Sequence, residues 1–424
     1  MKLYGHTGPM NPYSDNQSGE NVAVPSGEAE FSGEDVSFFD RERWHDVETR
    51  DEDDSPEVSL PNATLSSISV AILLLVSVVA AGSGLGFVYY IHQATRWAAL
   101  PNPDVSNDYR DIPQAWIGYT TDMAVRFREV EIPGCFAASS QGDVFVGEKD
   151  KPTLYCYSLQ GILLATLTLD DIPTAVVFGE VDTLFPGQLV VAFRNRLAVY
   201  STDGKQQTDW PPFRENGQVY SLALSTNAIF AADSAGLVVL RFDESGKLVR
   251  EIGRKPKETP KDDDENVFPG FVVFRSTISL TVSKATGMLF VANPGRHRVE
   301  VFDPDGHWEP SQSWGEASAE LFGFSGCCNP TWIDSLADGR IVTAEESSNL
   351  RVKTFFANGK PDWVVAGPDT LTYPPSNIPS PENVRTVLAS SERPIRVAAI
   401  SGDRIIVYDP VLRIFRLFLP TYKN

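Results

Sequence analysis

The segment TGMLFVANPGRHRVEVFDPDG, residues 286–306, decides the fold of this 424-residue chain. It contains two runs of β-forming residues, LFVAN and RVEVF, which are separated by the polar stretch PGRH. The second run ends in Phe302, and Gly306 follows four residues later, where a tight turn can use the positive φ that glycine tolerates. The segment therefore predicts two antiparallel strands and a turn into a further short strand.

The same spacing between an aromatic residue and a glycine recurs along the chain. The five copies are YSLQG (157–161), YSTDG (200–204), FDESG (242–246), FDPDG (302–306) and FFANG (355–359), and a weaker sixth copy, YDPVLR, begins at Tyr408 without the glycine. The turn glycines lie 43, 42, 60 and 53 residues apart. Periods in the forties are typical of β-propeller blades, so the sequence predicts six blades.

Each copy is preceded by another β-type run, and the two runs together are predicted to form the two strands of a hairpin. These runs are GDVFVGE, GQLVVAF, NAIFAAD, GMLFVAN, GRIVTAE and, in the sixth copy, VAAIS, which is followed by DRIIVY. The two long intervals indicate insertions around residues 254–266 and 309–322, which we expect to be surface loops. Residues 116–132, which contain AVRFREVEI, are expected to complete the last blade, because closing the ring removes exposed strand edges.

The first 62 residues differ sharply from the repeats. They carry 15 acidic and 4 basic residues, a net charge of −11 out of −20 for the whole chain. Their few apolar residues are scattered, so this segment cannot bury enough surface to offset the entropy of ordering, and we predict a disordered acidic tail over residues 1–62. No basic block accompanies it, which argues against a nucleic-acid partner.

An uncharged apolar stretch follows the tail. No Asp, Glu, Lys or Arg occurs from Val58 to Thr95, and the 24 residues from Ile68 to Ile91 are predominantly apolar. A helix of that length reaches about 36 Å, enough to cross a hydrocarbon core of about 30 Å. We therefore predict a transmembrane helix over residues 66–92, a linker over 93–112 and the propeller over 113–424.

The orientation of this span is a question of flanking charge. Arg50 is the nearest basic residue before it, and Arg96 and Arg110 follow it, which mildly favours a cytoplasmic C-terminal side. Large domains can nevertheless cross a membrane against so small a bias.

The segment quoted first and DGRIVTAEESSNLRVKTFFANG (338–359) resemble NHL repeats, in which a small-apolar strand, a polar loop and an Arg-aliphatic strand precede a turn glycine. The element GCCNP (326–330) resembles one found in bacterial, membrane-anchored proteins of this kind. The resemblance implies a six-bladed propeller outside the cytoplasm, in the periplasm, which opposes the weak charge signal.

Catalytic groups are sparse in the repeats. Propeller enzymes of similar architecture, such as amidating lyases and lactonase-like hydrolases, hold metal ions with His and carboxylate side chains, but the repeats contain only His297 and His307, both expected in exposed loops. A carboxylate-only calcium site stays open, and no cofactor is required by the sequence. The leading interpretation is a membrane-tethered binding or scaffold module, with a metal-dependent lyase or hydrolase as the alternative.

The adjacent residues Cys327 and Cys328 allow a third class of function. They are buried small side chains, disulfide partners of each other or of Cys135 and Cys156, or a site for thiol redox chemistry or metal handling. Four cysteines allow three complete pairings, and the sequence selects none of them.

A protein or small-ligand partner is expected at one mouth of the propeller. Polar residues at the ends of predicted strands, or just after them, would lie there, because loops on a rigid scaffold carry binding residues. The candidates are Asn293, Arg296, Arg298, Asn329, Glu345 and Glu346.

Overall fold

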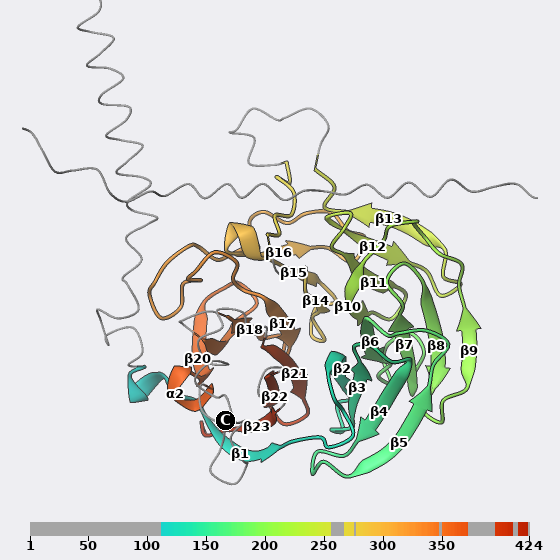
Figure 1. Cartoon of the computed structure of the whole chain (residues 1–424). Coiled ribbons are helices and arrows are strands. Elements are labelled where there is room, and N and C mark those ends of the chain that lie inside the picture. The colour runs from blue at the N-terminus through green and yellow to red at the C-terminus, as the bar shows by residue number, and fades with distance from the viewer. Residues whose placement is uncertain are drawn as a thin grey trace, which may run out of the picture. The chain divides into compact units, whose positions relative to one another are not determined.

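The computed structural model describes residues 112–255, 267–274, 277–346, 350–371, 395–409 and 414–422. Within them, six antiparallel sheets surround a central axis, as Figure 1 shows, which confirms the predicted all-β six-bladed propeller. The predicted tail and span, and the linker up to residue 111, lie outside the described residues. No helix in the described part of the chain is both long and apolar enough to cross a membrane.

The strands of each blade are given below in order from the innermost to the outermost. The first three blades contain β2 (Pro133–Ala138), β3 (Val144–Glu148), β4 (Thr153–Tyr157) and β5 (Leu163–Thr168); β6 (Ala175–Phe178), β7 (Gln188–Ala192), β8 (Leu197–Ser201) and β9 (Gln206–Asp209); and β10 (Val219–Leu224), β11 (Ile229–Asp233), β12 (Val238–Phe242) and β13 (Leu248–Ile252).

The last three blades contain β14 (Leu280–Val282), β15 (Leu289–Asn293) and β16 (Arg298–Phe302); β17 (Trp332–Ser335), β18 (Ile341–Glu345), β19 (Arg351–Phe355) and β20 (Pro361–Ala366); and β21 (Arg396–Ile400), β22 (Arg404–Asp409), β23 (Ile414–Pro420) and β1 (Tyr119–Val125). The described residues also contain three short helices: η2 (Gln114–Trp116), η3 (Pro294–Arg296) and α2 (Pro368–Leu371).

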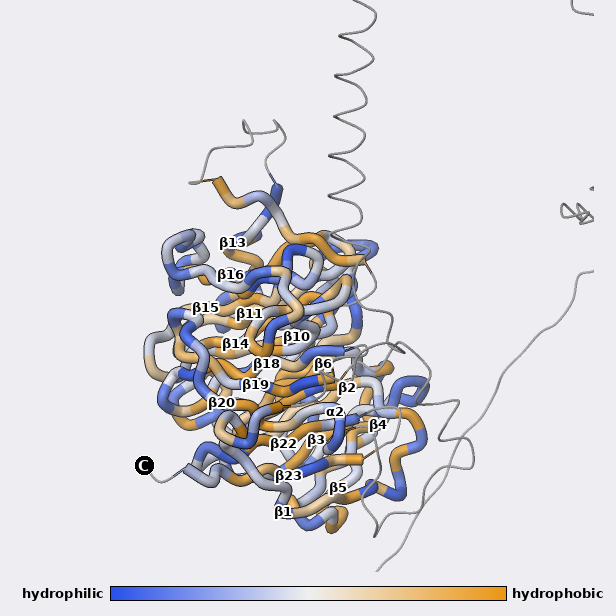
Figure 2. The backbone as a smooth tube through the Cα atoms, turned by 90° about the vertical axis from the view of Figure 1, so that its left-hand side faces the viewer, coloured by the Kyte–Doolittle hydropathy of each residue, from blue (hydrophilic) through white to orange (hydrophobic). Residues whose placement is uncertain are grey.

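Burial within a blade changes from strand to strand. The second strand of the third blade, β11, is buried over its whole length, because neighbouring blades cover both of its faces. The outermost strand β9 has the sequence QQTD and is mostly exposed. Figure 2 shows apolar segments concentrated along the strands of the propeller and polar ones along many of the connections.

The hydrophobic core is a ring of clusters between neighbouring blades. In one of them, Val190 and Val199 of the second blade pack with Leu222 and Leu240 of the third. Each of these four side chains is 7% exposed or less. Full burial of such a side chain contributes about 1.5–3 kcal/mol, so the contacts between blades hold the ring together.

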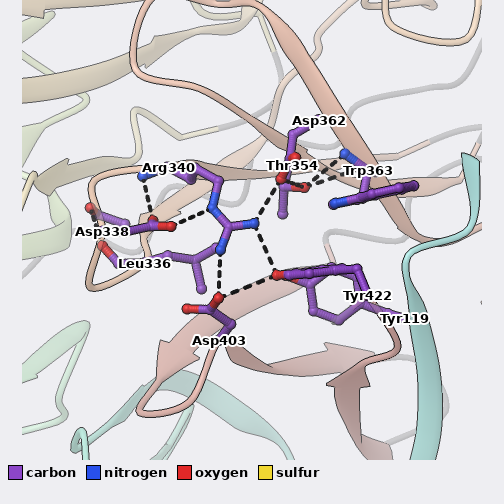
Figure 3. Close-up of polar contacts among 10 residues, drawn as sticks. Tyr119, Leu336, Asp338, Arg340, Thr354, Asp362, Trp363, Asp403 and Tyr422 are labelled. Carbon is purple, nitrogen blue, oxygen red and sulfur yellow. Dashed lines mark hydrogen bonds and ion pairs between the residues drawn. The ribbon is translucent and has the colours of Figure 1, made fainter. Parts of the chain in front are cut away.

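The ring closes in the sixth blade, where β1 pairs antiparallel with β23 and Tyr119 lies opposite Pro420. This confirms the prediction that residues 116–132 complete the last blade. A single arginine, Arg340, reinforces the closure from the fifth blade, as Figure 3 shows. Its guanidinium donates to Asp338, Asp362 and Asp403 at 2.6, 2.8 and 2.6 Å, and to the Tyr422 hydroxyl at 2.9 Å.

The repeat prediction is right in five blades, but in the sixth blade the two quoted runs are one strand position away from the predicted ones. The five turn glycines all have positive φ, between 77° and 89°. In the first five blades the two quoted runs form the second and third strands, but VAAIS and DRIIVY belong to the first and second strands of the sixth blade. The aromatic Tyr408 therefore lies in a second strand and not in a third one, so this copy is not equivalent to the five glycine copies.

The insertion around residues 309–322 is not simply a surface loop. Trp314 pairs with Val299 through two backbone hydrogen bonds, at 2.7 and 3.0 Å, and so extends the three-stranded fourth blade outwards. Trp314 is 9% exposed, and the centre of its ring lies 4.7 Å from the centre of the Phe355 ring. Residues 256–266 of the other insertion lie outside the described residues.

Candidate functional site

The innermost strands of all six blades line a cavity of about 370 Å³ at the centre of the propeller. Its wall is largely apolar, and includes Ala138, Val177, Leu222, Val282 and Ala399. Small-molecule sites are typically apolar hollows of roughly 300–1,000 Å³ that contain a few well-placed polar groups. The volume and lining of this cavity match that description.

The rim of the cavity comes from the connections between first and second strands. Its lining includes residues 225–227 and 283–284, together with Glu180, Asp182 and Thr183. Because the strands of a blade run alternately up and down, these connections lie on one face of the ring, and those between second and third strands lie on the other. The cavity therefore belongs to the first of these faces.

A half-buried carboxylate, Asp334 of β17, lies in the wall of the cavity. Its Oδ1 accepts hydrogen bonds from the Thr281 hydroxyl at 3.0 Å and the Ser335 N–H at 2.8 Å, and its Oδ2 accepts one from the Ala399 N–H at 2.7 Å. Burial raises the pKa of Asp334 above its ordinary value, although Lys284 and these hydrogen bonds act to lower it. The carboxylate is fixed in place but poorly solvated.

The other charged residues of the cavity lie at its rim. Glu180 accepts hydrogen bonds from the backbone N–H and the hydroxyl of Ser140, at 2.6 and 2.7 Å. Asp182 and Lys284 are exposed. With Asp334, the lining contains three carboxylates and one ammonium group, so its charge is negative.

The candidate residues of the fourth blade lie on the other face, at and after the end of β15. Asn293 is fully buried, accepts from the Val272 N–H at 2.9 Å and donates to Glu300 at 3.2 Å. Arg296 is exposed and donates to the backbone carbonyls of Gly270 and Pro269. Arg298 donates to the Ser313 carbonyl at 3.0 Å.

In the fifth blade, the structure brings together Asn329, Glu345 and Glu346. The Asn329 side chain accepts from the Glu346 N–H at 2.9 Å and donates to the Glu346 carbonyl at 3.0 Å. Glu345 is fully buried and forms an ion pair with Lys353, with 2.5 Å between Oε1 and Nζ. Asn329 and Glu345 thus hold the loops of this face together.

None of the six candidates lines the cavity, and their ligand-binding role stays a prediction. Sequence reasoning missed Asp334, which the structure places in the cavity wall. A signal for it exists in TWIDSL (331–336), because an acidic residue is unfavourable among the apolar residues of a strand. The cavity itself has no local signature, since its lining comes from six separate blades.

His297, expected in an exposed loop, is buried, with 8% of its surface exposed. It ends η3 in the left-handed region, at φ 56°. Burial lowers the pKa of its imidazole, and a hydrogen bond with the Phe324 backbone acts in the opposite direction. The imidazole is therefore held neutral between the β15–β16 loop of the fourth blade and the segment that links the fourth and fifth blades.

The described residues contain no group of three or more His, Cys, Asp or Glu side chains arranged to hold a metal ion. All four cysteines are described, and none of them forms a disulfide. The calcium site that the sequence left open has no candidate ligand set in the described ranges.

No protein-family model matches the chain, and no curated protein matches its sequence. Solved structures with a similar fold include virginiamycin B lyase from Staphylococcus aureus, as a catalytically inactive variant with quinupristin (14% identity, 68% of this chain, 80% of that chain, TM-score 0.45). A streptogramin B lyase is 12% identical, over 73% of this chain and all of that one, with a TM-score of 0.44.

A protein of unknown function from Bacteroides thetaiotaomicron is also similar (12% identity, 72% of this chain, 73% of that chain, TM-score 0.47). At these identities the likeness concerns the fold alone, and no activity is carried over from these proteins to this chain.

Proposed function

We propose that this chain is a membrane-tethered binding module whose propeller takes a ligand with an apolar body and a cationic group into its central cavity. The observation that carries the proposal is the Asp334 carboxylate, which three hydrogen bonds hold in an otherwise largely apolar wall. The size of the cavity, about 370 Å³, suits a small molecule or one side chain of a protein partner.

The electrostatics of the cavity support a cation rather than an anion. Burial raises the pKa of Asp334, which means that Lys284 and the three hydrogen bonds do not fully offset the desolvation of its charged form. A cation placed within about 4–6 Å would favour the charged form, so binding and ionisation would support each other. Glu180 and Asp182 at the rim add to the negative potential that draws a cation in.

The tether and the location of the module are part of the proposal. Residues 66–92 would anchor the chain through a single span, and the acidic segment 1–62 would lie on the far side of the membrane from the propeller. We propose that the blades are NHL-like repeats and that the propeller lies outside the cytoplasm, in the periplasm. The uncharged stretch from Val58 to Thr95 and the repeat pattern support these parts.

Three probes of similar shape test the choice of ligand: phenethylamine, 2-phenylethanol and 3-phenylpropionate. We expect calorimetry on the full chain in mild detergent at pH 7 to show the amine binding most tightly and the carboxylate most weakly. Asp334→Asn should reduce affinity for the amine about tenfold or more, the value of a charged hydrogen bond. Asp122→Asn, at an exposed site in β1, is the matched control and should leave it unchanged.

The pH dependence gives an independent test of Asp334. Because its pKa is raised, the carboxylate takes up a proton at pH values where an ordinary aspartate is still charged. Affinity for phenethylamine should therefore fall on acidification before that of a site with an ordinary aspartate, and Asp334→Asn should lose this part of the pH dependence. Equal binding of the amine and the alcohol in both proteins would refute the proposal.

A further inference from the structure

The loop that enters the fifth blade, residues 325–329, presents two adjacent thiols. Its ends are tied by a hydrogen bond from the Asn329 side chain to the Ser325 carbonyl at 2.6 Å. Asn329 is also bonded to both backbone groups of Glu346, which fixes the loop to the end of β18. The two cysteines therefore lie in a short loop whose backbone is held at both ends.

The two sulfur atoms are close and unequally accessible. The distance from Cys327 Sγ to Cys328 Sγ is 2.9 Å, and neither residue is in a disulfide. Cys327 is exposed, whereas Cys328 is 2% exposed. A reagent from solvent can reach the first sulfur, and the second lies within reach of any adduct that forms on the first.

The remaining cysteines lack this arrangement. Cys135 and Cys156 are buried in the first blade, and burial raises the pKa of their thiols to about 12 and about 11. Thiols with so high a pKa contain little of the reactive thiolate at neutral pH. Reactivity of the folded chain toward disulfides is therefore expected at the loop alone.

We propose that Cys327 and Cys328 form a reversible dithiol–disulfide site that reacts with low-molecular-weight disulfides. The Cys327 thiolate, its proton lost to solvent, attacks one sulfur of the reagent, whose S–S bond breaks and releases one thiolate. The Cys328 thiol gives its proton to the first released thiolate, its sulfur attacks the Cys327 sulfur, the mixed disulfide breaks, and the second thiolate leaves and takes up a proton from solvent. The two protein thiols are oxidised to a disulfide, and the reagent is reduced to two thiols.

The geometry of neighbouring residues makes this site reversible. Consecutive Cα atoms are about 3.8 Å apart across a trans peptide, which is shorter than the roughly 4.4–6.8 Å that a disulfide normally spans. A bond between adjacent cysteines is therefore strained, and strained, exposed disulfides are the ones that small thiols reduce readily. The pair is suited to redox exchange rather than to stapling the fold.

The test is the reaction of the reduced full chain, folded in mild detergent, with 5,5′-dithiobis(2-nitrobenzoate). The wild type should release about two thionitrobenzoate anions per chain and retain no adduct, because the second thiol expels the first adduct. Cys328→Ser should release about one anion and keep the adduct. Cys327→Ser should release none before unfolding.

Mass analysis of the wild type keeps the test decisive if a variant fails to fold. After treatment with oxidised glutathione, the peptide that contains both cysteines should have lost two hydrogens, and added dithiothreitol should restore them. A stable glutathione adduct on that peptide, or release of a single thionitrobenzoate by the wild type with the adduct retained, would overturn the proposal. So would an equal release by Cys327→Ser and the wild type.

Discussion

The two ends of strand β18 carry charged clusters that differ in their exposure to solvent. Arg340, which precedes the strand, contacts three aspartates, and its side chain is 9% exposed, while that of Asp338 is 50% exposed. At the other end, Glu345 pairs with Lys353, and both side chains are fully buried. One cluster reaches solvent, and the other lies inside the protein.

At the two ends of β18, burial and the neighbouring groups shift the pKa of the cation in different overall directions. Burial acts to lower the pKa of Arg340, but hydrogen bonds with Asp362 and Tyr422 raise it overall. Burial also lowers the pKa of Lys353, and there Glu345 does not reverse the effect. The Arg340 end thus gains from its charges, whereas the Lys353 end retains a desolvation penalty, which the ion pair with Glu345 limits.

The surroundings of Lys353 show how that penalty is limited. Its Nζ donates to the Gly323 carbonyl at 2.8 Å and the Leu321 carbonyl at 3.2 Å, and lies 4.9 Å from the centre of the Phe324 ring. These groups all belong to the connection between β16 and β17, which contains the insertion after the fourth blade. The buried pair therefore fixes that connection against β19.

The largest effect should come from Lys353→Met, which leaves the Glu345 carboxylate buried without its cation. We expect a loss of about 3–5 kcal/mol in the free energy of unfolding, measured by urea denaturation. The double variant Lys353→Met, Glu345→Gln should recover more than half of this loss, because position 345 then no longer carries a buried charge without its Lys353 partner.

The exposed Lys360→Met on the same blade is the control and should change stability by about 0.5 kcal/mol or less. If the double variant is as unstable as the sum of its single changes, the pair is not the source of the effect, and the contrast between the two ends of β18 fails.

A smaller loss, about 2 kcal/mol, is expected for Arg340→Met, because solvent reaches part of the cluster that it leaves behind. The three aspartates would then repel one another, and salt screens such repulsion between accessible charges. Raising the NaCl concentration from 0.05 to ~0.5 M, a range over which the Debye length shortens severalfold, should reduce the loss measured by urea denaturation. The loss caused by Lys353→Met should not respond to salt, and a similar salt response of both variants would remove the distinction.

The smallest effect concerns His297, which contacts the Phe324 backbone near the buried pair. Its lowered pKa means that the unfolded chain binds a proton more readily than the folded one, so stability falls as the pH drops through about 6.5. His297→Gln should lose less stability than the wild type between pH 7.5 and ~5.5, a window that brackets the pKa of an unperturbed histidine. Identical slopes for the two proteins would show that this histidine is not linked to folding.

The sequence predicts the hairpins of the middle strands well because burial on both faces gives them a strong apolar signal, as in β11. Outermost strands such as β9, with the sequence QQTD, lack that signal and become strands only by pairing with a neighbour. In the sixth blade the predicted strands are shifted by one position, because the outermost strand of that blade, β1, comes from the start of the propeller. The expectation that residues 116–132 complete the last blade came from the need to close the ring, and the repeat pattern by itself misassigned VAAIS and DRIIVY by one strand.

The candidate site illustrates a different limit. Polarity at strand ends identified Asn293 and Asn329, but both amides are used in hydrogen bonds that hold loops together. The sequence cannot distinguish an amide that binds a ligand from one that satisfies buried backbone groups, because both need the same residue type. The position of Asp334 in the cavity wall depends on neighbouring blades, which a local stretch of sequence does not reveal.

The closure of the ring by β1 and β23 has a consequence for biosynthesis. The ribosome releases β1 before any other strand of the propeller and releases its partner β23 last, so β1 has no partner in the nascent chain until translation of the domain is nearly complete. Unpaired strand edges invite association with other chains. A ribosome that stalls before residue 414 would therefore leave an open ring whose unpaired strand can associate with other chains, even if the earlier blades have folded.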